Sequence, residues 1–177
     1  MKRIMLLRHA KASPESDAGK DFDRPLTPRG EGAAPLMGRH MAATGRIPAR
    51  VVVSAARRAR DTVEGLWRDW PSSPPTSVEA DLYGVEPAGL MERLKRLPDD
   101  EDSVLLVGHN PAIQQAALDL AGGGDEGAYA AMRAKFPTAA LAVLDAEVER
   151  WTDLRPGVAE LIAFVRPKDL DGAASGP

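Results

Sequence analysis

The chain has 177 residues, 44% of them hydrophobic and 28% charged, which suits one domain with a full hydrophobic core. Its net charge of −3 argues against a general nucleic-acid-binding protein, and its lack of cysteine excludes disulfides, thiolate metal sites and a cysteine nucleophile. No apolar stretch approaches the roughly 18 residues of a membrane span, and the N-terminal apolar run is too short for a secretory signal, so we expect a cytoplasmic protein.

Strand and helix patterns alternate from the N-terminus onward. Residues 3–7 (RIMLL) form a short apolar run and predict a buried strand. Apolar residues at helical spacing over 33–41 predict an amphipathic helix, with Thr27 as its N-cap and Pro28 at its first position. Residues 50–54 (RVVVS) are rich in β-branched side chains and predict a second strand.

The middle of the chain continues this alternation. Apolar spacing over residues 59–70 predicts a one-faced helix, which the following PSSPP segment ends. Residues 87–97 predict another helix, and residues 103–108 (SVLLVG) predict a third core strand. Residues 111–123 predict a helix that a run of glycines stops.

Two late apolar runs, residues 140–144 (ALAVL) and 161–165 (LIAFV), predict further strands. Strands and helices that alternate at this length predict an α/β domain with helices on both faces of a sheet. We expect one domain over residues 1–166, followed by a polar, flexible tail over residues 167–177.

Basic and imidazole side chains follow three of the predicted strands: Arg8 and His9, then Arg57, Arg58 and Arg60, then His109 with Asn110. In open α/β sheets, ligands bind outside the carboxyl ends of the strands, so these groups together predict an anion site. Each of them taken alone is better explained as an ordinary structural or surface residue, but their gathering at one sheet edge is not. The chain has no glycine-rich phosphate loop, so side chains would hold the phosphate.

Four ordered motifs resemble the histidine phosphatase superfamily: LLRHAKA, DRPLTPRG, SAARRARDT and LLVGHNP. The compact length and the RHAKA and RPLT variants are most similar to SixA-type phosphohistidine phosphatases. The resemblance covers roughly residues 2–145. It implies a three-layer α/β/α, phosphoglycerate mutase-like fold with a mostly parallel central sheet. It also implies phosphoryl transfer without a metal ion or another cofactor.

The resemblance assigns roles to particular residues: His9 as nucleophile, Arg8 and Arg58 as phosphate-binding arginines, His109 as the second histidine, and Arg24 as an extra contact for the phosphate or its carrier. By the same spacing, Arg57 is a bystander, and the role of Lys11 stays open. Chemically, a neutral His9 attacks phosphorus, and water then hydrolyses the phosphohistidine. A protonated His109 needs a phosphate dianion or a nearby carboxylate, because the arginines lower the pKa of both histidines.

Two positions depart from the family pattern. Ala10 replaces the usual glycine after the Arg-His pair. Larger members also carry a glutamate general acid; here Glu79, Asp81 and Glu86 are the candidates, but each is better explained as an ordinary surface carboxylate. A missing acid favours phosphohistidine as substrate, because a protonated imidazole leaves far more readily than an alkoxide.

The leading interpretation is therefore a phosphohistidine phosphatase that acts on a phosphocarrier or phosphotransfer protein in signal transduction. The alternative is a phosphatase of small phosphorylated metabolites, such as sugar or nucleotide phosphates. A third interpretation is a phosphate-binding module without catalysis, which the intact His9 argues against. All three predict a phosphorylated partner, and none involves nucleic acid or a membrane.

Overall fold

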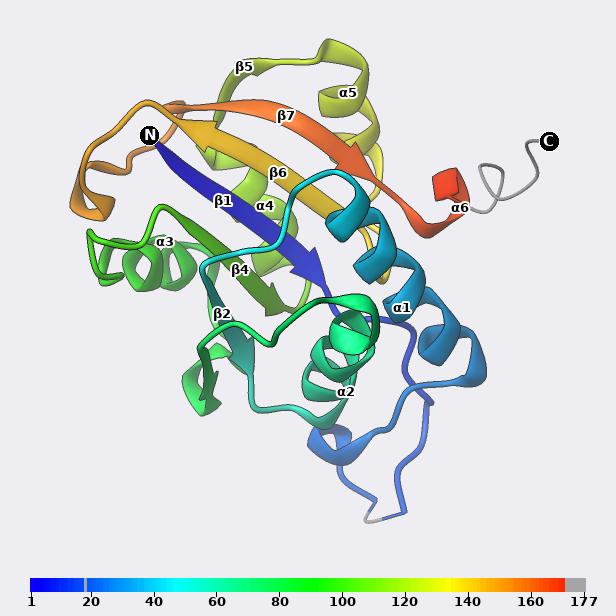
Figure 1. Ribbon diagram of the computed structural model, residues 1–177. Coiled ribbons are helices and arrows are strands. Elements are labelled where there is room, and N and C mark those ends of the chain that lie inside the picture. Colours follow the sequence, from blue (N-terminus) through cyan, green and yellow to red (C-terminus); the bar gives the residue numbers. More distant parts are fainter. Residues whose placement is uncertain (18, 171–177) are drawn as a thin grey trace, which may run out of the picture.

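A seven-stranded sheet forms the centre of the molecule in the computed structural model, which describes residues 1–17 and 19–170 (Figure 1). Its strands are β1 (Lys2–Arg8), β2 (Arg50–Ser54), β3 (Thr76–Glu79), β4 (Ser103–Gly108), β5 (Ala121–Gly124), β6 (Leu141–Ala146) and β7 (Ala159–Val165). The α-helices are α1 (Pro28–Ala43), α2 (Arg57–Leu66), α3 (Pro87–Lys95), α4 (Ala112–Leu120), α5 (Glu126–Ala134) and α6 (Pro167–Leu170). Short 3-10 helices are η1 (Asp21–Asp23), η2 (Trp67–Asp69), η3 (Ala80–Leu82) and η4 (Trp151–Asp153).

The strand order is β3-β2-β4-β1-β6-β7-β5. Strands β3, β2, β4 and β1 pair in parallel, whereas β6 is antiparallel to both of its neighbours, β1 and β7. Strand β5 then pairs in parallel with β7. Since β6 alone runs against the other strands, the sheet is mostly parallel. The predicted α/β fold is confirmed.

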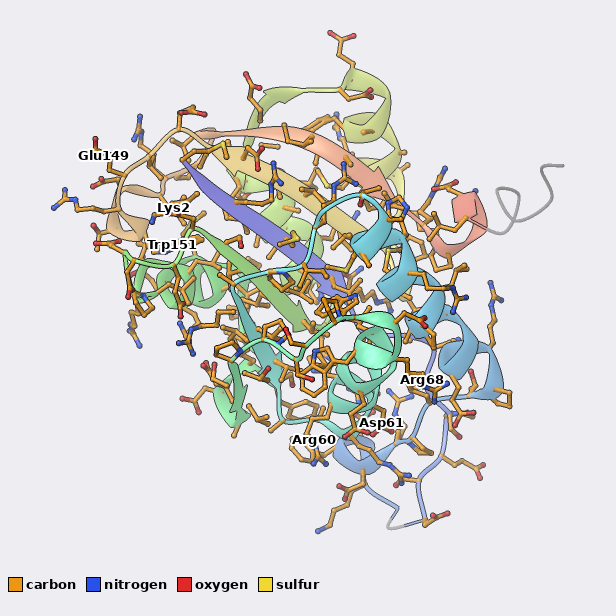
Figure 2. The ribbon with its side chains drawn as sticks, in the orientation of Figure 1. Lys2, Arg60, Asp61, Arg68, Glu149 and Trp151 are labelled. Carbon is orange, nitrogen blue, oxygen red and sulfur yellow. The ribbon has the colours of Figure 1, made fainter. Side chains whose placement is uncertain are left out.

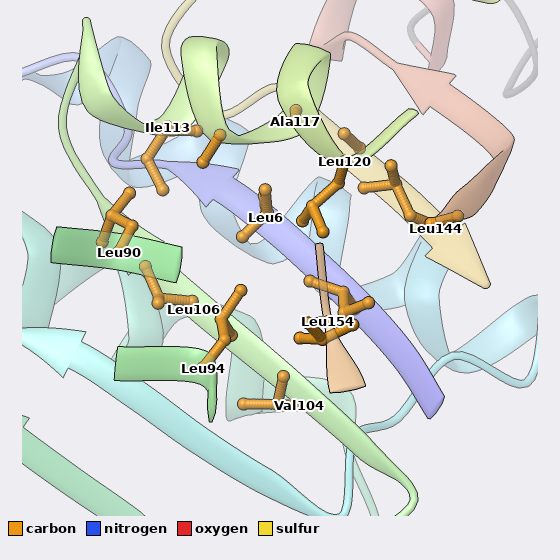
Figure 3. Packing of buried hydrophobic residues seen from close by; sticks show 14 of the residues in the cluster. Leu6, Leu90, Leu94, Val104, Leu106, Ile113, Ala117, Leu120, Leu144 and Leu154 are labelled. Atoms are coloured by element: carbon orange, nitrogen blue, oxygen red, sulfur yellow. The ribbon is translucent and has the colours of Figure 1, made fainter. Parts of the chain in front are cut away.

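Alternate residues of β1 pack on opposite faces of the sheet, as expected for a central strand buried on both sides. Leu6 belongs to the cluster that contains residues of α3 and α4, including Leu90 and Ile113 (Figure 3). Leu7 belongs to the cluster that contains Met37 of α1 and residues of α2. Leu6 and Leu7 are both fully buried, and each such side chain stabilises the fold by about 1.5–3 kcal/mol. Because β1 is apolar on both faces, helices cover both sides of the sheet, and the fold has three layers.

Helix α1 begins as the sequence predicts. The side chain of Thr27 accepts a hydrogen bond from the Gly30 backbone N–H at 3.2 Å, and Pro28 is the first helical residue. Gly30 packs directly on the backbone of Lys11, and a Cβ atom at this position would collide with it. This close approach holds the N-terminus of α1 against the segment that follows β1.

The second half of the sheet differs from the prediction. The helix predicted over residues 111–123 ends at Leu120, and the glycine run after it forms strand β5 beside β7. A Cβ atom at Gly122 would collide with the backbone of Gly157, so the glycines permit this close pairing. Helix α5, which the sequence patterns did not predict, begins at an N-cap in which Asp125 accepts from Ala128 N at 2.6 Å.

The two ends of β1 have different environments. At its amino end Lys2 is 2% exposed, and its Nζ atom donates to the carbonyl oxygens of Asp99 and Glu101 and pairs with Asp102. The Lys2 Nζ atom also lies 5.6 Å from the centroid of the Trp151 ring (Figure 2). Lys2 thus closes the core at the end opposite to the carboxyl ends of the parallel strands.

Residues 167–170, the first part of the predicted tail, form α6, which contacts α1. Residues 171–177 of that tail lie outside the described residues. None of the helices in the described part of the chain is long and apolar enough to cross a membrane.

Candidate active site

The carboxyl ends of β1, β2 and β4 bring four predicted site residues together. Arg8 ends β1 and His9 follows it, Arg58 lies in the first turn of α2 after β2, and His109 follows β4. Strands β2, β4 and β1 are neighbours in that order, so these groups share one edge of the sheet. The His9 and His109 ring centroids are 5.1 Å apart.

His9 is held in one orientation and one tautomer. Its Nδ1 atom lies 2.7 Å from the carbonyl oxygen of Ala10, so Nδ1 carries the proton and donates it. The lone pair is therefore on Nε2, which accepts a hydrogen bond from Arg58 Nε at 3.3 Å. Burial, and then the charges of His109, Arg58 and Arg8, lower the pKa of His9 to about 3. At neutral pH the imidazole is a neutral base with an available Nε2.

Arg58 is almost fully buried, whereas its neighbour Arg57 lies on the surface. The Arg58 side chain donates to His9 and to the backbone oxygen of Asp21, the latter at 2.8 Å. Thr62 ties α2 to the nucleophile loop, since its hydroxyl donates to Arg58 O at 2.6 Å and accepts from Ala10 N at 2.9 Å. Arg57 pairs instead with Asp61, at 3.5 Å. Of the two arginines, Arg58 is therefore the one that contacts His9, and its role in binding phosphate stays a prediction.

Arg8 is fixed from the other side of the site. Its Nη1 atom donates to the carbonyl oxygen of Phe136 at 2.9 Å, and Asn110 Nδ2 donates to the same oxygen at 3.2 Å. The buried Nε of Arg8 has no hydrogen-bond partner among the described residues. A guanidinium with five N–H donors that contacts one carbonyl oxygen keeps the capacity to bind an oxyanion.

His109 contacts the end of β2. Its Nε2 atom lies 2.8 Å from Ser54 Oγ, and its buried Nδ1 has no hydrogen-bond partner in the described part of the chain. Burial, and then Arg58, lower the pKa of His109 to about 4, while Asp21 raises it. With protein groups alone His109 is neutral at pH 7, so the protonated form expected in catalysis requires added negative charge, such as a phosphate dianion.

Arg24 is separated from His9 by Asp21 and Arg58. Its Nη1 atom donates to the carbonyl oxygen of Ser13 at 2.9 Å, and its Nε forms an ion pair with Asp21 Oδ1 at 2.8 Å. Arg24 is thus connected to Arg58 through Asp21 and has no direct contact with His9 within residues 1–17 and 19–170. A phosphate contact by Arg24 stays a prediction.

Two further residues lie at the site and were not predicted from the sequence, Asp21 and Tyr83. The Tyr83 hydroxyl donates to Asp21 Oδ2 at 2.6 Å, and Asp21 Oδ2 also pairs with Arg58 at 3.2 Å. The Tyr83 ring lies edge-on to His109, at a centroid distance of 5.7 Å. Asp21 comes three residues before the arginine of the DRPLT motif, and Tyr83 lies in the segment searched for a carboxylic acid, so position was the available signal for both.

The three carboxylates considered as general acids do not contact the site. Glu79 forms two hydrogen bonds of 2.7 Å with Arg93, which hold the pKa of Glu79 below its usual range. Glu79 and Asp81 line a hollow of about 400 Å³ beside α3 that contains none of the four predicted catalytic residues. Glu86 forms the N-cap of α3 without a side-chain hydrogen bond. In the described part of the chain, none of the three is hydrogen-bonded to His9 or His109.

Lys11, whose role the sequence left open, lies beside other basic residues at the surface. Its backbone oxygen accepts from Thr27 N at 2.8 Å, while its side chain is exposed. It lines a hollow of about 100 Å³ with Arg29, Arg166 and Lys168. Within residues 1–17 and 19–170, no group of three or more histidine, cysteine, aspartate or glutamate side chains is arranged to hold a metal ion.

Comparisons with known proteins indicate the family of the chain. A family model of the histidine phosphatase superfamily (branch 1) matches residues 4–83. An uncharacterised protein of Mycobacterium tuberculosis is 36% identical over 164 residues, which are 92% of this chain and 100% of that protein.

Two solved structures of proteins named as candidate phosphohistidine phosphatases, SixA, share the fold. The protein from Nakamurella multipartitia matches with a TM-score of 0.80 and 31% identity, over 94% of this chain and 96% of its own. The protein from Agrobacterium tumefaciens matches with a TM-score of 0.79 and 28% identity, over 94% and 98%. Both likenesses extend over the whole fold and are not confined to one motif.

Proposed function

The chain belongs to the histidine phosphatase superfamily, and we propose that it hydrolyses phosphohistidine on a phosphocarrier or phosphotransfer protein, through a phosphorylated His9 and without a metal ion. The observation that carries the proposal is the Nε2 atom of His9, which is unprotonated, anchored through Nδ1, and 3.3 Å from the Arg58 guanidinium. Arg8 and His109 complete an anion site around it.

The first half of the reaction transfers the phosphoryl group to the enzyme. The lone pair on His9 Nε2 attacks phosphorus, and the P–N bond to the substrate imidazole breaks on the opposite side. The leaving nitrogen takes a proton from solvent or from His109, so the substrate histidine departs neutral. Arg8 and Arg58 neutralise the charge on the equatorial oxygens of the phosphoryl group.

The second half regenerates the enzyme. A water oxygen attacks the phosphorus of the phosphorylated His9, the new P–N bond breaks, and its electron pair returns to Nε2. The proton released by the water goes to solvent or to His109, which restores its starting state. The balance is one phosphohistidine and one water consumed, with one histidine and one inorganic phosphate formed.

Phosphohistidine is the proposed substrate because its leaving group makes the smallest demand on a general acid. Glu79, one of the three candidate acids, is instead bound by Arg93. Both SixA-like proteins are named for phosphohistidine, which supports the same substrate class. A location in the cytoplasm and a role in signal transduction stay predictions of the sequence.

A phosphatase of small phosphomonoesters is the second candidate, and Tyr83 favours it. The Tyr83 hydroxyl lies at the site edge, and its hydrogen bond to Asp21 raises the pKa of Tyr83, so it stays protonated. A phenol beside His109 can donate a proton to an alkoxide leaving group, but its raised pKa makes Tyr83 a weaker acid than a free phenol, which keeps this candidate second.

One comparison of rates tests both candidates. We would measure kcat/KM for a histidine-phosphorylated protein domain and for p-nitrophenyl phosphate, with one enzyme preparation in EDTA and with H9A as the control for contaminating activity. A large preference for phosphohistidine supports the proposal, and a preference for the monoester supports the second candidate. Loss of all turnover in EDTA, restored by a divalent ion, would contradict the metal-free mechanism.

A further inference from the structure

Asp21 is bound by three groups that come from different parts of the chain. Its Oδ2 atom accepts the Tyr83 hydroxyl at 2.6 Å and pairs with Arg58 Nη2 at 3.2 Å. Its Oδ1 atom pairs with Arg24 Nε at 2.8 Å, and its backbone oxygen accepts Arg58 Nη1 at 2.8 Å. Asp21 therefore holds both terminal nitrogens of Arg58, although its own side chain is half-exposed.

We propose that Asp21 is a positioning residue of the site: with Tyr83 it aligns the buried guanidinium of Arg58 on the nucleophile and acts electrostatically on His109. The inference rests on the proposed phosphatase function. It adds a residue that none of the four sequence motifs assigns to catalysis.

The geometric part of the argument concerns the direction of the Arg58 guanidinium. A planar guanidinium whose two Nη atoms are fixed has its Nε direction fixed as well. In this site the fixed Nε points at His9 Nε2. Because Arg58 is 5% exposed, water cannot easily replace Asp21 as its partner. Removing the carboxylate charge therefore weakens the contact to Nη2, one of the two that orient Arg58, while the backbone oxygen of Asp21 still holds Nη1.

The electrostatic part concerns the two histidines, which must differ in charge during catalysis. The titratable and polar groups around His109 come from five places in the fold. They are Arg8 and His9 at the end of β1, Asp21 and Arg24 at η1, Ser54 of β2, Arg58 of α2, and Tyr83 after η3. Among these groups Asp21 is the carboxylate, and it raises the pKa of His109 while the arginines lower it.

The charges that act on His9 all work in one direction. His109, Arg58 and Arg8 each lower its pKa, with no comparable contribution from a carboxylate. Asp21 thus acts on His109 and not on His9, and it favours the charged form of His109, to which a bound phosphate dianion adds its own negative charge. Tyr83, Arg58 and Arg24 in turn hold the pKa of Asp21 below its usual range, so it stays ionised.

Two substitutions at the site and one matched control test the inference. D21N removes the charge but keeps the shape, and Y83F keeps the ring against His109 but removes the hydrogen bond to Asp21. Asp23 lies in the same short helix, and its side chain has no hydrogen bond or ion pair with another described residue, so D23N is the control for a lost surface charge. Because Asp21 is half-exposed, we expect all three proteins to fold, which thermal unfolding would check.

The first readout is the pH dependence of kcat on the better of the two substrates. Protonated His109 is needed, so activity falls as pH rises through its pKa in the complex. We expect D21N to move this alkaline limb down by about one pH unit and to lower kcat about tenfold or more. Y83F should change both in the same direction by less, and D23N should change neither. If the alkaline limb of the kcat profile lies at the same pH in D21N, D23N and wild type, the inference is overturned.

The second readout does not depend on turnover. NMR titration of the His109 ring with saturating inorganic phosphate should give a lower pKa in D21N than in wild type or D23N. Equal values in all three proteins would refute the electrostatic part. If the wild type hydrolyses neither substrate, the proposed function fails, while this titration still decides the effect of Asp21.

Discussion

The side chain of Arg58 offers the sharpest test of how this site holds a phosphoryl group. In R58K the positive charge remains, but a lysine has one nitrogen in place of three. Arg58 contacts His9 Nε2 at 3.3 Å, the backbone oxygen of Asp21 at 2.8 Å and Asp21 Oδ2 at 3.2 Å. One lysine nitrogen cannot reach all three atoms together. The substitution therefore tests geometry while it preserves charge.

The expected loss follows from the contacts that disappear. Removing one preorganised donor to a developing oxyanion lowers kcat by about 10²–10³. R58K loses the planar pair of donors and the alignment with His9, so we expect kcat/KM to fall by about 10²–10³. R57K is the matched control, because Arg57 is half-exposed and pairs with Asp61 at 3.5 Å. Its effect should stay within about threefold, the scale of a surface ion pair.

The assay compares kcat/KM of wild type, R58K and R57K at pH 7 in EDTA, on the substrate that wild type hydrolyses faster. Thermal unfolding of the three proteins separates loss of activity from loss of fold. If R57K lost more activity than R58K, the assignment of the second phosphate-binding arginine would be wrong. Near-wild-type activity in R58K would show that charge alone is sufficient.

Three further predictions follow from burial and charge. H9A should abolish turnover and accumulate no phosphoenzyme, and because His9 is 8% exposed it should also lower the melting temperature by a few degrees; turnover near wild type would exclude His9 as nucleophile. The free energy of unfolding should fall as pH decreases from about 6.5 to about 4. The pKa is about 3 for His9 and about 4 for His109 in the folded protein and about 6.5 for both in the unfolded chain, so the unfolded chain binds more protons in this range. Urea unfolding of H109Q should show a shallower pH dependence than wild type, and an identical slope would contradict this reasoning. K2M should cost about 1–3 kcal/mol in urea unfolding, since the carbonyl oxygens of Asp99 and Glu101 lose a buried donor, and it should leave kcat unchanged because Lys2 lies at the opposite end of β1.

The elements that the sequence predicted well are those set by local patterns. Strand β1 reads as apolar at every position from Ile4 to Leu7, and the start of α1 is marked by Thr27 and Pro28. The gathering of Arg8, His9 and His109 also followed from sequence, because chemical groups placed directly after parallel strands meet at one sheet edge.

The glycine run after α4 shows where local pattern is insufficient. Residues 121–124 carry no side chains beyond Ala121, so hydrophobic periodicity contains no signal for a strand there. Their strand conformation comes from pairing with β7, which lies some forty residues later in the chain. Backbone hydrogen bonding to a distant partner, and not intrinsic propensity, determines such a segment.

By itself the sequence determined the fold class, the family and the four residues at the strand ends, because each depends on the type and spacing of nearby residues. Tertiary structure decided that Glu79 is paired with Arg93, and that Asp21 and Tyr83 lie beside Arg58 and His109. Asp21, Arg58 and Tyr83 are far apart in the chain and meet through loop geometry. The charge on a carboxylate and its effect on a histidine depend on distances of a few ångströms, which the fold sets and no sequence spacing specifies.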